Sequence, residues 1–247
     1  MNKKIFQPII TVSIALLIFS GCTAPQGGAN GTTYGGLNKS QLGAITGAVL
    51  GATIGGATDT KHTSRGRRMV IGGATGAAIG AAIGYSLDQQ AKEVAQVLNT
   101  DVDNSPTAEK NPNKQLIVSN TDKFVKIMFR SQMMFATNSA IPTPSARAEI
   151  QNMLPVFRKY PNMIIQTVGH TDNRGGYQYN LRLSENRASS VGNILKNGGI
   201  NNPIYSKGCS FSKPIVPNTN SRNWALNRRV EVYLYPNQQS VIDPCRN

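Results

Sequence analysis

The chain of 247 residues has few acidic, histidine, cysteine and aromatic side chains. It carries 12 Asp and Glu against 26 Lys and Arg, and the net charge of +14 favours an anionic partner such as a nucleic acid, a membrane surface or an acidic polymer. With two histidines, three cysteines and no CxxC spacing, we expect no zinc site, and nothing in the chain indicates a cofactor. Aromatic residues make up 6% while glycine reaches 24 residues, so part of the chain differs from an ordinary packed core.

The sequence also lacks the groupings of side chains on which hydrolytic enzymes depend. No serine or cysteine is convincingly paired with a histidine, and no HxxE-type metal spacing occurs. Asp172 and Glu185 are the acids that lie close together in the main C-terminal motif, and Arg187 would neutralise one of them. We therefore expect no catalytic activity. Nucleic-acid binding is disfavoured as well, because the basic residues are dispersed without interleaved aromatics.

The N-terminus has the pattern of an export signal. Two lysines precede an apolar run over residues 9–19, which is too short to span a bilayer, and Ser-Gly-Cys follows at 20–22. This resembles the lipobox of bacterial lipoproteins, in which the peptide is cut before the cysteine and the cysteine receives lipid. Residues 1–21 are thus the expected signal peptide and Cys22 the expected site of lipid attachment. The alternative is an ordinary signal peptide with a chance cysteine.

The residues that follow Cys22 bear on the destination of the protein. In the enteric sorting rule an Asp after the lipid cysteine signals retention in the inner membrane, so Thr23 resembles sorting to the outer membrane. Residues 22–41 are rich in Gly, Asn, Thr and Ser and are expected to form a flexible tether. We expect a lipid-anchored protein of the cell outer membrane with its C-terminal domain in the periplasm.

Two segments, 42–57 and 69–87, repeat glycine at every fourth position: Gly43, Gly47, Gly51 and Gly55, then Gly72, Gly76, Gly80 and Gly84. This spacing places each set on one helix face, where glycine is favourable if another helix approaches closely. The pattern resembles the glycine-zipper hairpins of bacterial envelope lipoproteins and predicts a possible homo-oligomer. A membrane-embedded or membrane-associated hairpin and a soluble one both stay open, because the segments are mildly apolar. Helical spacing continues to residue 98, and 99–113 is expected to be a linker.

Residues 114–236 have a mixed α/β pattern, which predicts a separate C-terminal domain. Thr143 before Pro144 suits a helix cap and first helical position. Alternating apolar residues over 230–235 indicate a final, half-buried strand, followed by a tail over 237–247. The other expected elements are strands at 116–118, 124–129 and 163–169, a helix face at Ile150, Met153, Leu154 and Phe157, and a helix over 181–197.

Three segments of this domain occur in the order of a known family. They read FATNSA at 135–140, GHTDNRGGYQYNLRLSENRA at 169–188 and NRRVEV at 227–232. Residues 115–236 therefore resemble the OmpA C-terminal domain family, although Ala136 replaces its frequent Asp. The resemblance implies an α+β fold, a two-layer β-α-β-α-β sandwich with helices on one face of the sheet, preceded by the glycine-zipper hairpin. The complete layout resembles the YiaD-type lipoproteins.

The resemblance also implies a ligand. Members of the family bind the peptide stem of peptidoglycan through diaminopimelate, whose side chain ends in a zwitterion. By resemblance, Arg187 takes the carboxylate and Asp172 the ammonium. The flanking contacts carried over are Asn138, Asn180, Leu183 and Arg228. The alternative is that Asp172 caps the helix or closes a turn and that Arg187 pairs with it internally.

Cys209 and Cys245 remain after export to an oxidising compartment, and a disulfide and two free thiols both stay open.

The function predicted from the whole sequence is non-catalytic tethering of the outer membrane to the cell wall. The rival prediction is an envelope assembly protein that oligomerises through the glycine zipper and uses wall binding as an anchor.

Overall fold

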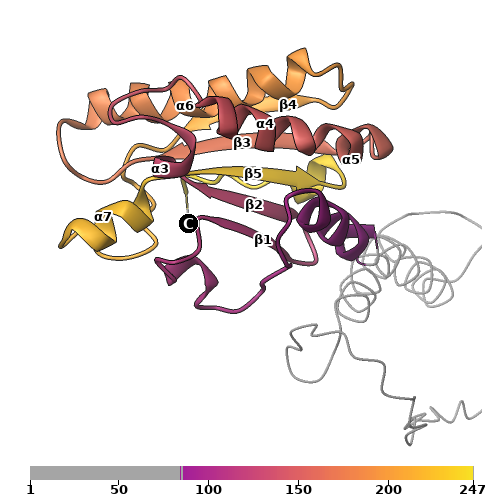
Figure 1. Ribbon diagram of the computed structural model, residues 1–247, viewed down its shortest axis with the longest axis horizontal. Helices are drawn as coiled ribbons and strands as arrows, with labels where there is room; N and C mark the ends of the chain where they lie inside the picture. Colours follow the sequence, from indigo (N-terminus) through magenta and orange to yellow (C-terminus); the bar gives the residue numbers. More distant parts are fainter. Residues whose placement is uncertain (1–83, 85, 247) are drawn as a thin grey trace, which may run out of the picture. The chain divides into compact units, whose positions relative to one another are not determined.

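The computed structural model describes residue 84 and residues 86–246 (Figure 1). The expected signal peptide, Cys22, the tether and nearly all of the glycine-zipper hairpin lie outside the described residues. In the described part of the chain, no helix combines the length and the apolar character that a membrane span requires.

A five-stranded sheet forms the centre of the domain, in the order β1-β2-β5-β3-β4. The last strand in the sequence, β5, lies between β2 and β3 and is antiparallel to both, so Val232 faces Ile127 on one side and Thr167 on the other. Strands β3 and β4 are parallel, and α6 connects them. The strands are β1 (Leu116–Asn120), β2 (Val125–Arg130), β3 (Ile164–His170), β4 (Ile204–Gly208) and β5 (Arg229–Tyr235).

Helices α4, α5 and α6 cover one side of this sheet (Figure 1). The predicted start at Thr143 is confirmed, because its hydroxyl accepts a hydrogen bond of 3.2 Å from the Ala146 N–H and Pro144 is the first helical residue. The single expected helix that follows is two helices, because Pro155 has no N–H with which to continue the first one. The helices are α3 (Ser131–Met134), α4 (Pro144–Asn152), α5 (Leu154–Lys159), α6 (Tyr177–Asn197) and α7 (Ser221–Asn227).

The expected linker at 99–113 and the domain boundary at 113 are wrong. Residues 86–97 are helical, and Leu87, Val94 and Leu98 are buried in the same apolar core as Val118 of the sheet. Val102 forms a β-bridge with Val118, so the segment after this helix pairs with the sheet edge. The sequence does not predict this pairing, because turn-forming residues over 99–113 do not indicate whether their backbone contacts water or a strand.

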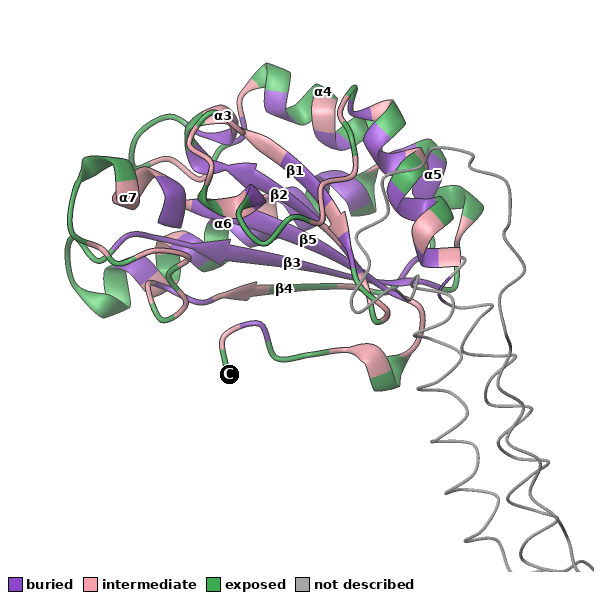
Figure 2. Cartoon of the chain, turned by 90° about the horizontal axis from the view of Figure 1, so that it is seen from below, coloured by how far each residue is buried: buried purple, intermediate pink, exposed green. Residues whose placement is uncertain are grey.

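The expected half-buried final strand is also wrong, because all seven residues of β5 are buried (Figure 2). On the face away from α6, Glu231 accepts hydrogen bonds from Arg229 Nε at 2.8 Å and from the Tyr233 hydroxyl at 2.8 Å. His170 Nε2 lies 3.2 Å from the same carboxylate. A charged residue that alternates with valine predicts a solvated face, but here the charges pair with one another beneath other segments of the chain.

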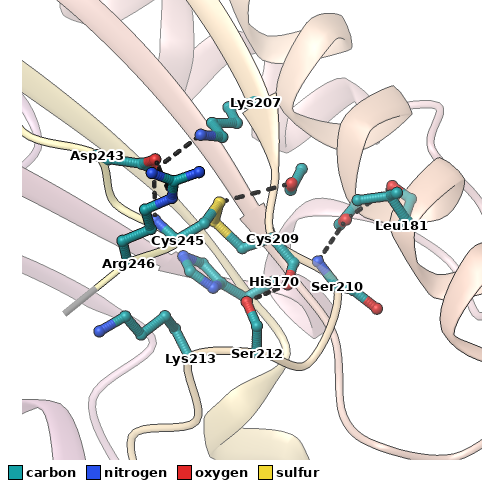
Figure 3. The surroundings of a disulfide bond; sticks show 12 residues. His170, Leu181, Lys207, Cys209, Ser210, Ser212, Lys213, Asp243, Cys245 and Arg246 are labelled. Atoms are coloured by element: carbon teal, nitrogen blue, oxygen red, sulfur yellow. Dashed lines mark hydrogen bonds and ion pairs between the residues drawn. A yellow bond between two sulfur atoms is a disulfide. The ribbon is translucent and has the colours of Figure 1, made fainter.

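One of these segments is the C-terminal tail. A disulfide joins Cys209, directly after β4, to Cys245, with Cα atoms 5.2 Å apart. Lys207 forms an ion pair of 2.8 Å with Asp243 beside it (Figure 3). The tail also contains the short 3-10 helix η2 (Gln238–Ser240). A second 3-10 helix, η1 (Ala108–Lys110), lies in the segment before β1. The tail is therefore attached to the sheet rather than detached from the domain.

Candidate functional site

The six residues predicted to bind the wall peptide line one cavity of about 610 Å³. This volume lies within the ordinary range of small-molecule sites. Four parts of the chain form it: the segment from α3 to residue 138, the loop between β3 and α6, the first half of α6, and Arg228 after α7. The predicted residues that it gathers are Asn138, Asp172, Asn180, Leu183, Arg187 and Arg228.

The loop between β3 and α6 places Asp172 at the bottom of this cavity. Asp172 is 4% exposed, and its Oδ1 accepts a hydrogen bond of 3.0 Å from the backbone N–H of Arg174, which closes a tight turn. Gly175 follows with φ +87°, a conformation that L side chains rarely adopt. The Asn180 amide then donates to the Arg174 carbonyl at 2.9 Å and fixes the loop against the first turn of α6.

The carboxylate of Asp172 is not free, contrary to the expectation that it receives a ligand ammonium directly. Oδ1 accepts from Arg174 N at 3.0 Å and Nε at 3.2 Å, while Oδ2 accepts from Arg174 Nη2 at 3.0 Å and Arg228 Nη1 at 2.7 Å. These four bonds fill the acceptor positions of an ionised carboxylate. Burial raises the pKa of Asp172, but the bonds from Arg174 and Arg228 outweigh it and hold the pKa below its usual value. Asp172 is therefore paired internally, but with Arg174 and Arg228 and not with Arg187, the internal partner considered from the sequence.

Arg187 is in the opposite situation. It is 4% exposed, its Nε donates to the Ser139 carbonyl at 2.9 Å, and its guanidinium carbon lies 5.1 Å from the centre of the Phe135 ring. Burial and the nearby charge of Arg228 lower the pKa of Arg187, but a guanidinium remains charged at neutral pH. Among residues 84 and 86–246, no ion pair involves Arg187. A buried cation without a carboxylate partner is costly, so an anionic ligand at this position is favoured.

The remaining predicted residues have different roles from one another. Asn180 supports the loop through its bond to Arg174 instead of extending the binding surface beside Arg187. Arg228 directly follows α7 and forms an ion pair with Asp172. It therefore acts on the binding site through its charge. Asn138 has a left-handed backbone with φ 57°, which asparagine tolerates better than most residues, and Leu183 contributes the apolar part of the wall.

Sequence reasoning missed several residues that line this site. Arg174 is the main partner of Asp172, and its position two residues later in the same motif was a signal that could have found it. Tyr179, 47% exposed, stands at the cavity wall. The hydroxyls of Ser131 and Thr171 are buried in the wall and have no hydrogen-bond partner among the described residues. Nothing in the local sequence distinguishes these two hydroxyls from others.

The charges of the cavity indicate what it can bind. Arg174, Arg187 and Arg228 line it, and Asp172 is the acidic residue that lines it within the described part of the chain. Three guanidinium groups against one carboxylate leave an excess of positive charge, which suits a planar carboxylate. Across residues 84 and 86–246, no group of three or more His, Cys, Asp or Glu side chains is arranged to hold a metal ion.

Comparison with known proteins gives two family matches and several similar chains. Residues 134–228 match the OmpA family, and residues 1–88 match the YMGG-like Gly-zipper family. The chain is 31% identical over 239 residues to the lipoprotein YiaD of Escherichia coli (strain K12), covering 96% of this chain and 100% of YiaD. It is 36% identical over 86 residues to outer membrane porin F of Pseudomonas aeruginosa, covering 34% of this chain and 25% of the porin. The solved structure of the cell wall anchor of the T6SS from Pseudomonas aeruginosa aligns with TM-score 0.45 and 24% identity, over 53% of this chain and 94% of that chain.

Proposed function

Because this chain belongs to the OmpA family and is related to YiaD along nearly its whole length, we propose that it tethers the outer membrane to the cell wall by binding peptidoglycan non-covalently, without catalysing a reaction. The relatives named as outer-membrane lipoproteins and porins support an outer-membrane location. In this proposal lipid on Cys22 holds the chain in the membrane, and the folded domain lies in the periplasm.

The observation that carries the proposal is the buried guanidinium of Arg187, which forms no ion pair with a carboxylate of the described residues. A peptide stem that contains diaminopimelate presents a free carboxylate at the end of that residue's side chain, and the guanidinium fork can bind both of its oxygens. Arg228 adds a second positive charge at the same cavity. The affinity of a single domain for the wall peptide can be low, because the lipid anchor keeps the domain at a high effective concentration near the wall.

Sedimentation with purified peptidoglycan tests this proposal on the full chain in detergent. We expect the wild type to sediment with the wall and Arg187→Ala to bind about 10-fold or more weakly, since a hydrogen bond to a charged group contributes roughly 1.5–3 kcal/mol. Arg187→Lys keeps the charge but loses the fork, so it should restore binding in part. Arg182→Ala, on the exposed side of α6, removes the same charge and should bind like the wild type. A wild type that stays in the supernatant would contradict the proposal.

A second function is favoured by the YMGG-like Gly-zipper match over residues 1–88. In this proposal the repeated glycines bring copies of the chain together, and wall binding serves as an anchor for the oligomer. Deleting residues 42–83 should abolish oligomers detected by chemical cross-linking while peptidoglycan sedimentation stays unchanged. The deletion stops before Leu87, because that side chain belongs to the core of the wall-binding domain. Oligomers that persist without residues 42–83 would rule out this role for the repeat.

A further inference from the structure

Arg174 is largely exposed to solvent although it is bonded to the buried acid of the binding site. Its side chain is 57% exposed, yet it supplies two bonds to Asp172, whose side chain is 6% exposed. Arg228, the other partner of Asp172, is 28% exposed and bonds through one nitrogen at 2.7 Å. The cavity thus holds an exposed cation on the buried acid to which the family resemblance assigns a ligand's ammonium group.

We propose that Arg174 is an internal competitor for the ammonium group of the ligand. Its guanidinium occupies Asp172 in the free protein and leaves it when the zwitterionic end of a wall peptide binds. This inference rests on the proposed function, because it assigns a step to the same cavity. It follows from the geometry of Asp172: four donors fill its acceptor positions, so an ammonium group cannot bind there unless one donor withdraws.

Arg174 is the donor that can withdraw most easily. Its guanidinium is 57% exposed and can exchange its two bonds to Asp172 for bonds to water, although the carboxylate itself is 6% exposed. Its backbone does not have to move, since the Asp172 turn and the Asn180 amide hold it in place. Arg228 is less exposed and forms the shorter bond, so it stays to neutralise Asp172 while the ammonium group enters.

The displaced side chain also has a surface to which it can remain bound. The guanidinium carbon of Arg174 already lies 4.5 Å from the centre of the Trp224 ring. The indole N–H of Trp224 donates to the Asn218 carbonyl at 3.2 Å, which fixes the orientation of the ring. A cation over an aromatic ring is stabilised by the ring quadrupole, so Arg174 retains this contact after it leaves Asp172.

The competition affects the two halves of a zwitterionic ligand differently. A carboxylate reaches Arg187 without disturbing Arg174, because Arg187 has no acidic partner among the described residues to give up. An ammonium group has to replace Arg174 on Asp172. In the proposed function the ligand carries both groups, and Arg174 lowers the gain in affinity that the ammonium group contributes.

Calorimetric titration of the full chain in detergent separates these contributions. The probes are meso-diaminopimelate and pimelate, which has the same carbon chain and carboxylates but no amines. We expect Arg174→Gln to bind diaminopimelate about two- to fivefold more tightly, which is the effect of removing one ion pair whose cation is exposed to water. The same variant should bind pimelate no more tightly than the wild type. Arg182→Gln loses the same charge outside the cavity and should change neither affinity.

Fluorescence gives a second readout, because Trp224 is the single tryptophan of the chain. Diaminopimelate should change its emission in the wild type, because the guanidinium that stays over the Trp224 ring loses its ion pair with Asp172. This change should be absent in Arg174→Gln although the heat of binding remains. If Arg174→Gln weakens both probes equally, Arg174 contacts the ligand carboxylate directly; this overturns the competitor role and leaves the proposed function intact. A wild type that binds neither probe nor purified peptidoglycan contradicts the proposed function itself.

Discussion

Gly169→Ala should strongly destabilise the domain and disrupt the binding cavity. A Cβ atom at this position would lie 2.0 Å from the carbonyl oxygen of Ser184 and 2.7 Å from its carbonyl carbon. Both are backbone atoms of α6, so no side-chain rotation can relieve the overlap. The helix would have to move away from β3, and it carries Leu183 and Arg187 of the cavity wall.

The expected loss in the free energy of unfolding is about 3 kcal/mol or more, at the upper end of the effects of overpacking a core. Urea unfolding of the full chain in detergent measures it, and peptidoglycan sedimentation of the folded fraction measures the damage to the cavity. Gly176→Ala is the matched control, because a Cβ atom there meets nothing within 4 Å and φ is −71°. Equal stability of the two variants would show that β3 and α6 can separate without cost.

Glu231→Gln has the second largest expected effect, again on stability. Glu231 is 3% exposed and accepts hydrogen bonds from Arg229 and Tyr233 at 2.8 Å. The variant keeps the shape of the side chain but leaves the buried charge of Arg229 without its anion. Removing one partner of a buried ion pair typically costs about 3–5 kcal/mol. Glu185→Gln, on the exposed side of α6, should have an effect close to zero in the same urea experiment.

The buried group around Glu231, which includes His170 and Arg229, predicts how stability depends on pH. Burial raises the pKa of Glu231, but Arg229 and the hydrogen bonds outweigh it and hold the pKa well below its usual value of 4.5. Burial and the charge of Arg229 lower the pKa of His170 below its usual 6.5, so this ring stays neutral. Both shifts stabilise the fold above the pKa of the unfolded chain. Stability should therefore fall as the pH drops below 6.5, and fall again below 4.5.

Unfolding midpoints in urea between pH 8 and pH 3 measure this dependence. In Glu231→Gln the loss below pH 4.5 should be smaller, because the titrating carboxylate is gone. A wild type whose stability rises on acidification would contradict the assignment of the two groups.

Much of this domain follows from local sequence. The cap at Thr143, four of the five strands and most of the long helix follow from periodicity and capping chemistry, because each depends on residues within a few positions of one another. Strand β4 and the first turn of α6 were not predicted. The six predicted site residues line one cavity, because the motifs at 135–140, 169–188 and 227–232 occur in the order of the family.

The tertiary structure decided what depends on contacts between distant segments. Residues 99–113 are part of the domain because Val102 pairs with Val118 and the preceding helix enters the core. The charged side of β5 is buried because Glu231 finds Arg229 and His170 as partners beneath other segments of the chain. Asp172 is occupied because Arg228 reaches it from a segment 56 residues away, while Arg174 folds back within the loop. Periodicity reports which side of an element is apolar, but the partner that neutralises a buried charge is set by how the chain folds in space.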